Sequence, residues 1–165
     1  MAYATCGRSL ALAALCLLAL TAWVSCGAEE DGVSNESDVA AEIDTFTMDH
    51  YNGSDLRWQL TGTRAQVSKD GDTVAVDNPR VLLYDAGLPS LSITGVFGIV
   101  DKDTHNLTIS ESVRAVAADG VLVTEELEWC DASGTLSSKT DVELRRRGSV
   151  VYGSSMTSLP DLQQV

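Results

Sequence analysis

The sequence predicts an all-β domain from residue 45 onward, and three observations lead to this prediction. Apolar and polar residues alternate with a period of two, as in Leu56, Trp58 and Leu60, and not with the longer period of a helix. Each alternating run has the short length of a half-buried strand. Turn sequences rich in Gly, Asp and Asn recur about every 10 to 18 residues, which is typical of an antiparallel meander.

Successive apolar runs and turn sequences predict the individual strands in chain order. The apolar runs lie at residues 56–60, 74–76, 91–93, 107–109, 122–129, 142–144 and 150–152. The turn sequences lie at 69–72, 77–79, 85–87, 101–103, 118–120, 132–134 and 147–148. The alternation changes parity after Thr124. Residues 109–118 would also suit one face of a helix, but the strands on either side favour an extended chain.

An uncharged apolar run from Ser9 to Ala28 follows Arg8 and ends near Ser25 and Cys26. A short apolar run of this kind is typical of a secretory export segment, and the small residue before a cysteine is typical of bacterial lipoproteins. We therefore expect Cys26 to be acylated and to anchor the chain. Alternatively the run stays uncut, since it is long enough for a helix across the roughly 30 Å apolar core of a bilayer.

Both alternatives predict one membrane-tethered domain outside the cytoplasm. We expect residues 1–25 to form the signal or anchor segment, residues 26–44 an acidic flexible linker, and residues 45–165 the β domain. The linker prediction rests on the acidic and small residues between Glu29 and Glu42.

The composition argues against several classes of function. The chain has 11 basic and 24 acidic residues and a formal charge of −13, which argues against binding to nucleic acid. Only Cys130 lies beyond the export segment, so the sequence predicts neither an internal disulfide nor a cysteine-based metal site.

The residues with catalytic chemistry form no recognisable site. His50 and His105 lie far apart without metal-ligand spacing, and the sequence has neither a nucleophile elbow nor a phosphate-binding loop. We expect no catalytic residue, no metal and no cofactor, so a secreted hydrolase subunit is disfavoured. The basic cluster at residues 145–147 has two interpretations: contact with an acidic or phosphate-bearing partner, or protection of a strand edge, which is favoured.

Four segments, taken in order and spacing, resemble the LptC family, the membrane-tethered periplasmic component of lipopolysaccharide export. They are W-Q-L-T-G-T-R-A (58–65), N-P-R-V-L-L-Y-D (78–85), D-G-V-L-V-T-E-E-L-E-W (119–129) and V-V-Y-G-S-S-M (150–156). The resemblance implies an open-ended twisted antiparallel β-jellyroll, of the OstA-like kind, anchored to the inner membrane in the periplasm. It implies lipopolysaccharide as ligand, and as partners the inner-membrane ABC transporter subunits and a soluble periplasmic jellyroll that forms a bridge.

Strand parity and the resemblance together nominate the site residues. The residues that parity places on the inward face, as candidates to line a trough for acyl chains, are Trp58, Leu60, Leu83, Ile93, Ile109, Leu127 and Trp129. Gly153 matches a glycine of the family's C-terminal strand region, where the next jellyroll docks, and Met156 is a candidate edge or mouth residue. The alternative function is a structural or adhesive surface lipoprotein, in which the same inward residues form the closed core of a β-sandwich.

Overall fold

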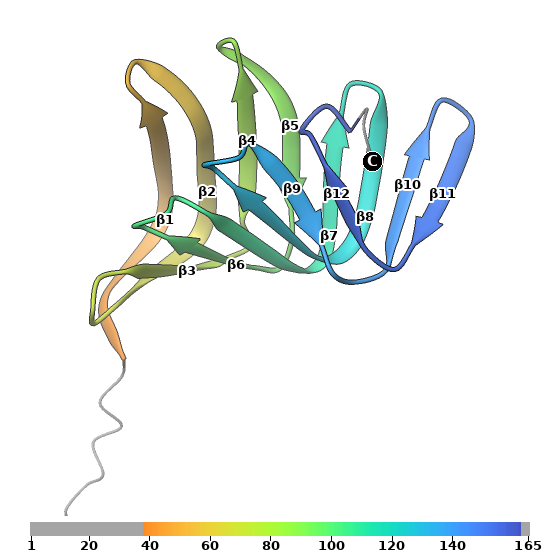
Figure 1. Cartoon of the computed structure of the whole chain (residues 1–165). Coiled ribbons are helices and arrows are strands. Elements are labelled where there is room, and N and C mark those ends of the chain that lie inside the picture. The colour runs from red at the N-terminus through yellow and green to blue at the C-terminus, as the bar shows by residue number, and fades with distance from the viewer. Residues whose placement is uncertain (1–37, 163–165) are drawn as a thin grey trace, which may run out of the picture. The chain divides into compact units, whose positions relative to one another are not determined.

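A computed structural model describes residues 38–162, which lie in a compact unit extending from Glu36 to Val165. Its described residues form twelve strands and no helix, which confirms the predicted all-β class (Figure 1). The strands are β1 (Val39–Asn52), β2 (Asp55–Ser68), β3 (Thr73–Asp77), β4 (Arg80–Asp85), β5 (Leu88–Thr94), β6 (Phe97–Asp101), β7 (Leu107–Ala117), β8 (Gly120–Cys130), β9 (Thr135–Ser138), β10 (Val142–Arg146), β11 (Ser149–Gly153) and β12 (Met156–Ser158). Cys26 and the predicted anchor segment 1–25 lie outside the described residues.

The antiparallel strands form one continuous hydrogen-bonded sheet that folds over on itself. Three long strands make this possible because each changes neighbour along its length. β2 pairs first with β4 and then with β3, β7 first with β6 and then with β5, and β8 first with β10 and then with β9. The long strands therefore belong to both halves of a folded sheet, which is the jellyroll arrangement that the family resemblance implies.

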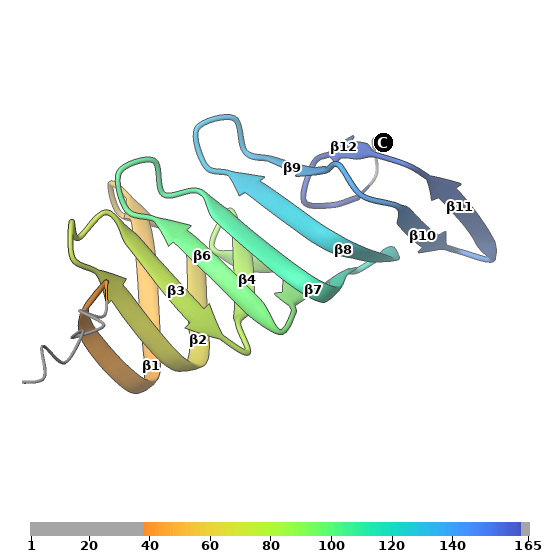
Figure 2. The same ribbon diagram turned by 90° about the horizontal axis from the view of Figure 1, so that it is seen from below.

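We call the two halves layer 1 and layer 2. Layer 1 contains β4, β5, β10 and β11, which stand upright in Figure 1, and layer 2 contains β3, β6, β9 and β12, which run obliquely across them. Seen from below in Figure 2, the two sets of strands cross over a shared interior. Connections between the layers, such as residues 78–79 and 95–96, lie along one side, which we call the crease. The opposite side, where the hairpin ends of both layers lie, is the mouth.

The bends at the crease explain two irregularities in the sequence pattern. β8 pairs with β10 up to Thr124 and with β9 only from Glu128, so the change of parity after Thr124 marks the bend of the strand. In β7 the bend is a bulge at Glu111 and Ser112, whose φ angles are 65° and 56°. Because Glu111 and Ser112 both lie in this bulge, the buried residues Ile109 and Val113 are four positions apart, as on a helix face, although residues 109–117 are extended as expected.

β1 begins at Val39, so residues 39–44, predicted as part of the flexible linker, belong to a strand. Residues 40–44 are exposed and include the apolar Ile43 as well as the acidic Glu42 and Asp44, and this part of β1 pairs with β2. Glu42 accepts a hydrogen bond of 2.9 Å from Gln66 and lies 3.7 Å from Nε of Arg64. The strand is stabilised by its long-range partner, a contribution that local composition does not reveal.

Gly62 lies where β2 crosses the crease, and substitution to alanine is expected to destabilise the fold. A Cβ atom at this position would lie 2.6 Å from Cγ1 of Val76 and 2.8 Å from Cε1 of Phe46, closer than van der Waals contact allows. We expect Gly62→Ala to lower the free energy of unfolding by about 1–3 kcal/mol, the usual cost of overpacking, in urea denaturation. Gly153→Ala is the matched control, because its nearest neighbours would lie at 3.4 Å. Equal stability of the two variants would contradict this account of the crease.

Candidate functional site

The predicted trough residues all lie in the interior between the layers. Trp58 and Leu60 come from β2, Leu83 from β4 and Ile93 from β5, all in layer 1. Ile109 from β7, and Leu127 and Trp129 from β8, face them from layer 2. Each of these side chains is at most 4% exposed, and all belong to one hydrophobic cluster. Strand parity therefore identified the inward face.

The burial of these side chains means that the interior is filled and is not an open trough. Residues that line an open trough are not fully closed over, whereas here the side chains of the two layers cover one another. The reason is that both layers present branched aliphatic and indole side chains large enough to fill the space between them. A long apolar ligand could enter this interior only if the layers moved apart at the mouth.

A polar cluster bridges the two layers at the mouth near the N-terminal end of the sheet. His50 and Arg57, from β1 and β2, belong to layer 1, whereas His105 and Asp131 come from the hairpins β6–β7 and β8–β9 of layer 2. The His50 and His105 rings stack with centroids 4.1 Å apart. Nε2 of His50 lies 3.3 Å from Oδ2 of Asp131, and Nε of Arg57 lies 3.9 Å from Oδ1 of the same carboxylate. We call these four residues the mouth cluster.

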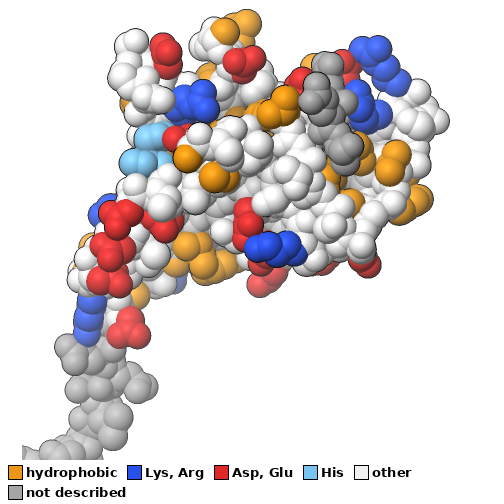
Figure 3. Space-filling view, in the orientation of Figure 1, with side chains coloured by type: hydrophobic (Ala, Val, Ile, Leu, Met, Phe, Trp, Pro, Cys, Tyr) orange, Lys and Arg blue, Asp and Glu red, His pale blue; other side chains and the backbone are white. Residues whose placement is uncertain are grey.

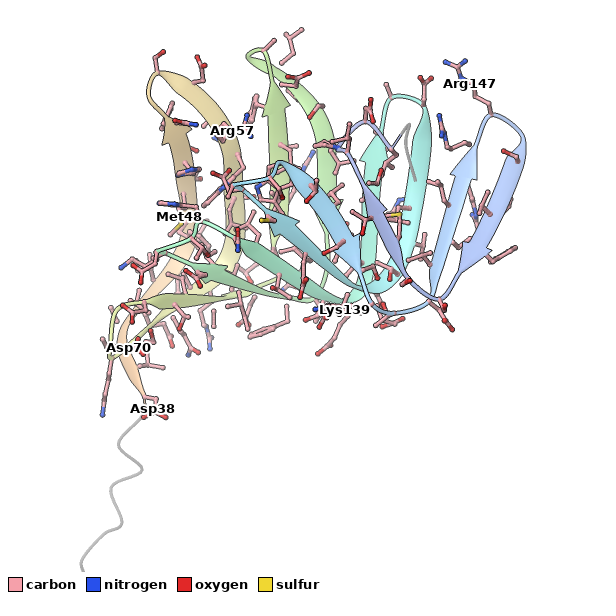
Figure 4. The ribbon with its side chains drawn as sticks, viewed as in Figure 1. Asp38, Met48, Arg57, Asp70, Lys139 and Arg147 are labelled. Atoms are coloured by element: carbon pink, nitrogen blue, oxygen red, sulfur yellow. The ribbon has the colours of Figure 1, made fainter. Side chains whose placement is uncertain are left out.

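The mouth cluster is a feature that the sequence did not reveal. Figure 3 shows the histidine side chains in pale blue below the β1–β2 hairpin, and Figure 4 labels Arg57 beside β2. Its members come from four separate segments and share no local motif, so only the folding of the sheet brings them together. Asn106 supports the cluster, because its side-chain oxygen accepts a hydrogen bond of 3.0 Å from the backbone N–H of Asp131.

The segment after β12 covers another part of the mouth. Leu162 is fully buried in the hydrophobic cluster, and a turn in which its N–H bonds to the carbonyl of Leu159 brings it there. A cavity of about 250 Å³ lies beneath this segment, with walls formed by Leu159 and Pro160, by Arg57 and Trp129, and by the β4–β5 hairpin. We call it the mouth cavity.

The two ends of the folded sheet carry strands with an unpaired side. At one end β1 pairs with β2 alone, and at the other end of layer 1 β11 pairs with β10 alone, among the described strands. All five residues of β11 are exposed, including Val150 at 48%, Val151 at 54% and Tyr152 at 74%. Consecutive exposed apolar residues on an unpaired strand are a hazard in a monomer, so they indicate an interaction surface.

The two predicted docking residues have different positions. Gly153 ends β11 and is exposed, at the unpaired end of layer 1. Met156 begins β12 at the crease, but its side chain is only 5% exposed and packs in the hydrophobic cluster. The side chain of Met156 therefore contributes to the core and not to the outer edge, because it points inward from β12.

The basic residues 145–147 and Cys130 have local partners. Arg147 donates a hydrogen bond of 2.7 Å to Asp119, which raises the pKa of the guanidinium, and Arg145 pairs with Glu143 with the same effect. These pairs favour the interpretation of the cluster as charge beside a strand edge. Hydrogen bonding from Ser133 lowers the pKa of the Cys130 thiol, at the end of β8. Within residues 38–162, no group of three or more His, Cys, Asp or Glu side chains is placed to hold a metal ion.

The comparison with protein families gives a match that covers almost the whole chain. The family model described as "Lipopolysaccharide-assembly, LptC-related" matches residues 10–165. The chain belongs to the LptC family. Family membership gives it a role in lipopolysaccharide transport, as a transport component and not an enzyme, and the family is anchored to the inner membrane and periplasmic. No curated protein matches the chain. Within residues 38–162, no helix has the length and apolar character to cross a membrane.

Proposed function

We propose that this LptC-family chain binds lipopolysaccharide in the interior between its layers, accepts it from an inner-membrane ABC transporter and passes it to a soluble periplasmic jellyroll. The observation that carries the proposal is the apolar interior, which runs from β2 at one end of the sheet to β10 at the other. Burial of an acyl chain contributes about 0.8 kcal/mol per methylene, so several chains would be costly to expose to water during transfer. When the apolar interiors of successive proteins adjoin, the acyl chains stay buried throughout the transfer.

The unpaired strand edges support the proposed direction of transfer. β1 lies next to the tethered N-terminal part of the chain, so it is the edge for the transporter side. β11, at the far end of the sheet order, is the edge for the soluble jellyroll. Backbone hydrogen bonds across an edge would extend the sheet from one protein into the next and align their interiors. Gly153 lies at this β11 edge.

Site-specific photo-cross-linking tests lipid binding in the interior. A photoreactive amino acid at Ile93, which is 1% exposed, is expected to form adducts with lipopolysaccharide in cells. The matched control is the neighbouring position Ser92, whose side chain points to the opposite face of β5. Adducts are read as a lipopolysaccharide-reactive band of higher mass. If neither position 93 nor position 60 forms adducts while the protein is folded, the interior does not carry the lipid.

The second candidate is a structural or adhesive surface lipoprotein, and the complete burial of the interior side chains favours it. A closed sandwich needs no motion at the mouth and would give no adduct at Ile93. The same experiment therefore separates the two functions.

The proposed lipid anchor at Cys26 has its own test. We expect the mature protein to begin at Cys26, with a mass that includes acyl chains, because the preceding apolar run ends in a small residue. Mass spectrometry of the N-terminal peptide from membranes measures this directly, and Cys26→Ala should retain the residues before position 26. Detection of those residues in the wild-type mature protein would assign the anchor to an uncut helix and leave the transport proposal in place.

A further inference from the structure

The outer face of layer 1, which points away from the interior, carries a groove that the proposed function does not use. Its walls come from three neighbouring strands and include Leu82 of β4, Ser90 and Ser92 of β5, Val116 of β7, and Ala118 in the turn that follows. The volume of the groove is about 420 Å³, within the range of roughly 300–1,000 Å³ that is usual for small-ligand sites. We call it the outer groove.

Small side chains between larger ones hollow out this face. Leu82, Ser92 and Val116 are register partners on adjacent strands and so share the outer face. Ser90, two positions from Ser92, continues the low centre of the face toward the mouth, and its hydroxyl donates a hydrogen bond of 3.2 Å to the carbonyl of Leu83. The groove therefore follows β5 and offers a mostly apolar surface that suits a linear apolar chain.

Two exposed arginines without a partner lie at the crease end of the outer groove. Arg80 on β4 and Arg114 on β7 are both in register with Thr94 on β5, so the three residues form the next row on the outer face. Arg80 and Arg114 are therefore about 10 Å apart at the backbone, which is twice the spacing of neighbouring strands. Within residues 38–162, neither guanidinium forms an ion pair or a hydrogen bond with another residue.

The carboxylates that line the outer groove do not offset these two arginines. Asp119 and Asp161 lie at the opposite end of the groove, at the mouth. Asp119 is paired with Arg147 at 2.7 Å, and Asp161 also has a partner. Unpaired positive charge thus remains at the crease end. A phosphate between Arg80 and Arg114 would accept charge-assisted hydrogen bonds from both guanidinium groups.

The groove and the two arginines together indicate the chemistry of a ligand. A single apolar chain fills the groove, and one anionic phosphate meets the arginines, which is the composition of an anionic lysophospholipid. A membrane that contains phospholipids is within reach, because the LptC family is anchored to the inner membrane. The sheet itself separates the outer groove from the interior, so this site is distinct from the one proposed for lipopolysaccharide.

We propose that the outer groove binds the acyl chain of an anionic lysophospholipid, with the phosphate of that lipid between Arg80 and Arg114. The site goes beyond the proposed function and does not depend on it, because it lies on the opposite face of layer 1. It gives the domain a second lipid specificity, set by the charge of the head group.

Photo-cross-linking of the full chain in isolated membranes tests the proposal. A photoreactive amino acid replaces Ser92, and the membranes are supplied with lauroyl-lysophosphatidylglycerol or with its zwitterionic analogue lauroyl-lysophosphatidylcholine, which has the same acyl chain. Mass spectrometry of the intact protein measures the yield of each adduct. We expect about three- to tenfold more adduct with the anionic lipid, since two exposed charge pairs contribute modestly. If the variant at Ser92 fails to fold, the exposed groove residue Ala118 carries the photoreactive group.

The double variant Arg80→Gln with Arg114→Gln should give equal yields of the two adducts. The matched control is Arg64→Gln with Lys139→Gln, which removes the same amount of charge from layer 2, where these side chains pair with Glu42 and Glu128. This control should keep the preference for the anionic lipid. A loss of the preference in the control would assign it to the general charge of the domain and overturn the proposal.

Three other results would also overturn the proposal. They are an absence of lysophospholipid adducts at Ser92 and Ala118, equal yields of the two lipids before the arginines are replaced, and a preference that survives their replacement. Lipopolysaccharide adducts at Ile93, measured in the same membranes, report on the proposed function separately, so either proposal can fail while the other stands.

Discussion

Replacing Tyr152 with proline is expected to weaken binding of the proposed soluble jellyroll partner at least about tenfold while the domain stays folded. The prediction depends on which way the Tyr152 N–H points. β10 and β11 are joined by a two-residue turn, Arg147 and Gly148, whose φ angles of 34° and 85° are both positive, as a type I′ turn requires.

In such a hairpin the residues flanking the turn, Arg146 and Ser149, form a hydrogen-bonded pair, and pairs then alternate along the ladder. Tyr152 lies opposite Glu143 in a pair that is not hydrogen-bonded, so its N–H points away from β10 to the unpaired side. Proline at this position removes a donor that an added strand needs and leaves the bonds to β10 intact.

The measurement is co-purification of the partner jellyroll and transfer of lipopolysaccharide to it, each expected to fall at least about tenfold for Tyr152→Pro, since loss of 1.4 kcal/mol or more corresponds to that factor. Tyr152→Ala keeps the N–H and removes the side chain, which is 74% exposed, so it separates the backbone contribution from the apolar one. Normal transfer by a folded Tyr152→Pro protein would place the docking surface elsewhere.

A covalent link across the mouth cluster is expected to exclude lipid from the interior. His50 in layer 1 and Asp131 in layer 2 contact each other at 3.3 Å, so a bridge between these positions holds the two layers together. Because the interior side chains are almost fully buried, lipid entry requires the layers to separate, and the bridge should prevent that separation.

The experiment uses the double variant His50→Cys and Asp131→Cys with Cys130→Ser, joined by a bis-maleimide reagent whose spacer a reductant can cleave. Photo-adducts of lipopolysaccharide at Ile93 are expected to fall at least about tenfold after bridging, which corresponds to 1.4 kcal/mol or more, and to return after cleavage. Each single-cysteine variant treated with the reagent is the control for modification without a bridge. Undiminished adducts in the bridged protein would mean that lipid enters at the sheet ends and not through the mouth.

The two predictions differ in how far sequence alone could support them. The strand β11 follows from a short apolar run after a turn sequence, which is a local signal, but the sequence predicts a half-buried strand, whereas all five residues are exposed. No local sequence pattern indicates that His50 and Asp131 face each other. They are 81 positions apart, and their contact depends on how far β1 and β8 bend at the crease.

For the interior, too, local sequence predicted one part and tertiary structure decided the other. Parity placed Trp58 and Ile93 on the inward face, because in a strand the direction of a side chain is set by its position alone. Whether those side chains line an open trough or cover one another depends on the distance between two layers, which is a tertiary property. Met156 illustrates the limit, since a residue just after a predicted edge strand lies in the core.

The sequence by itself determined the β class, the inward face of the strands, the parity change after Thr124 and the family resemblance. Each of these depends on residues that are neighbours in the chain or on the order and spacing of short segments along it. The tertiary structure alone decided that the interior is filled, that the mouth cluster joins the layers, and that β1 begins at Val39. These properties arise from contacts between segments far apart in the chain, whose free energy depends on the packing of the whole sheet and not on any local pattern.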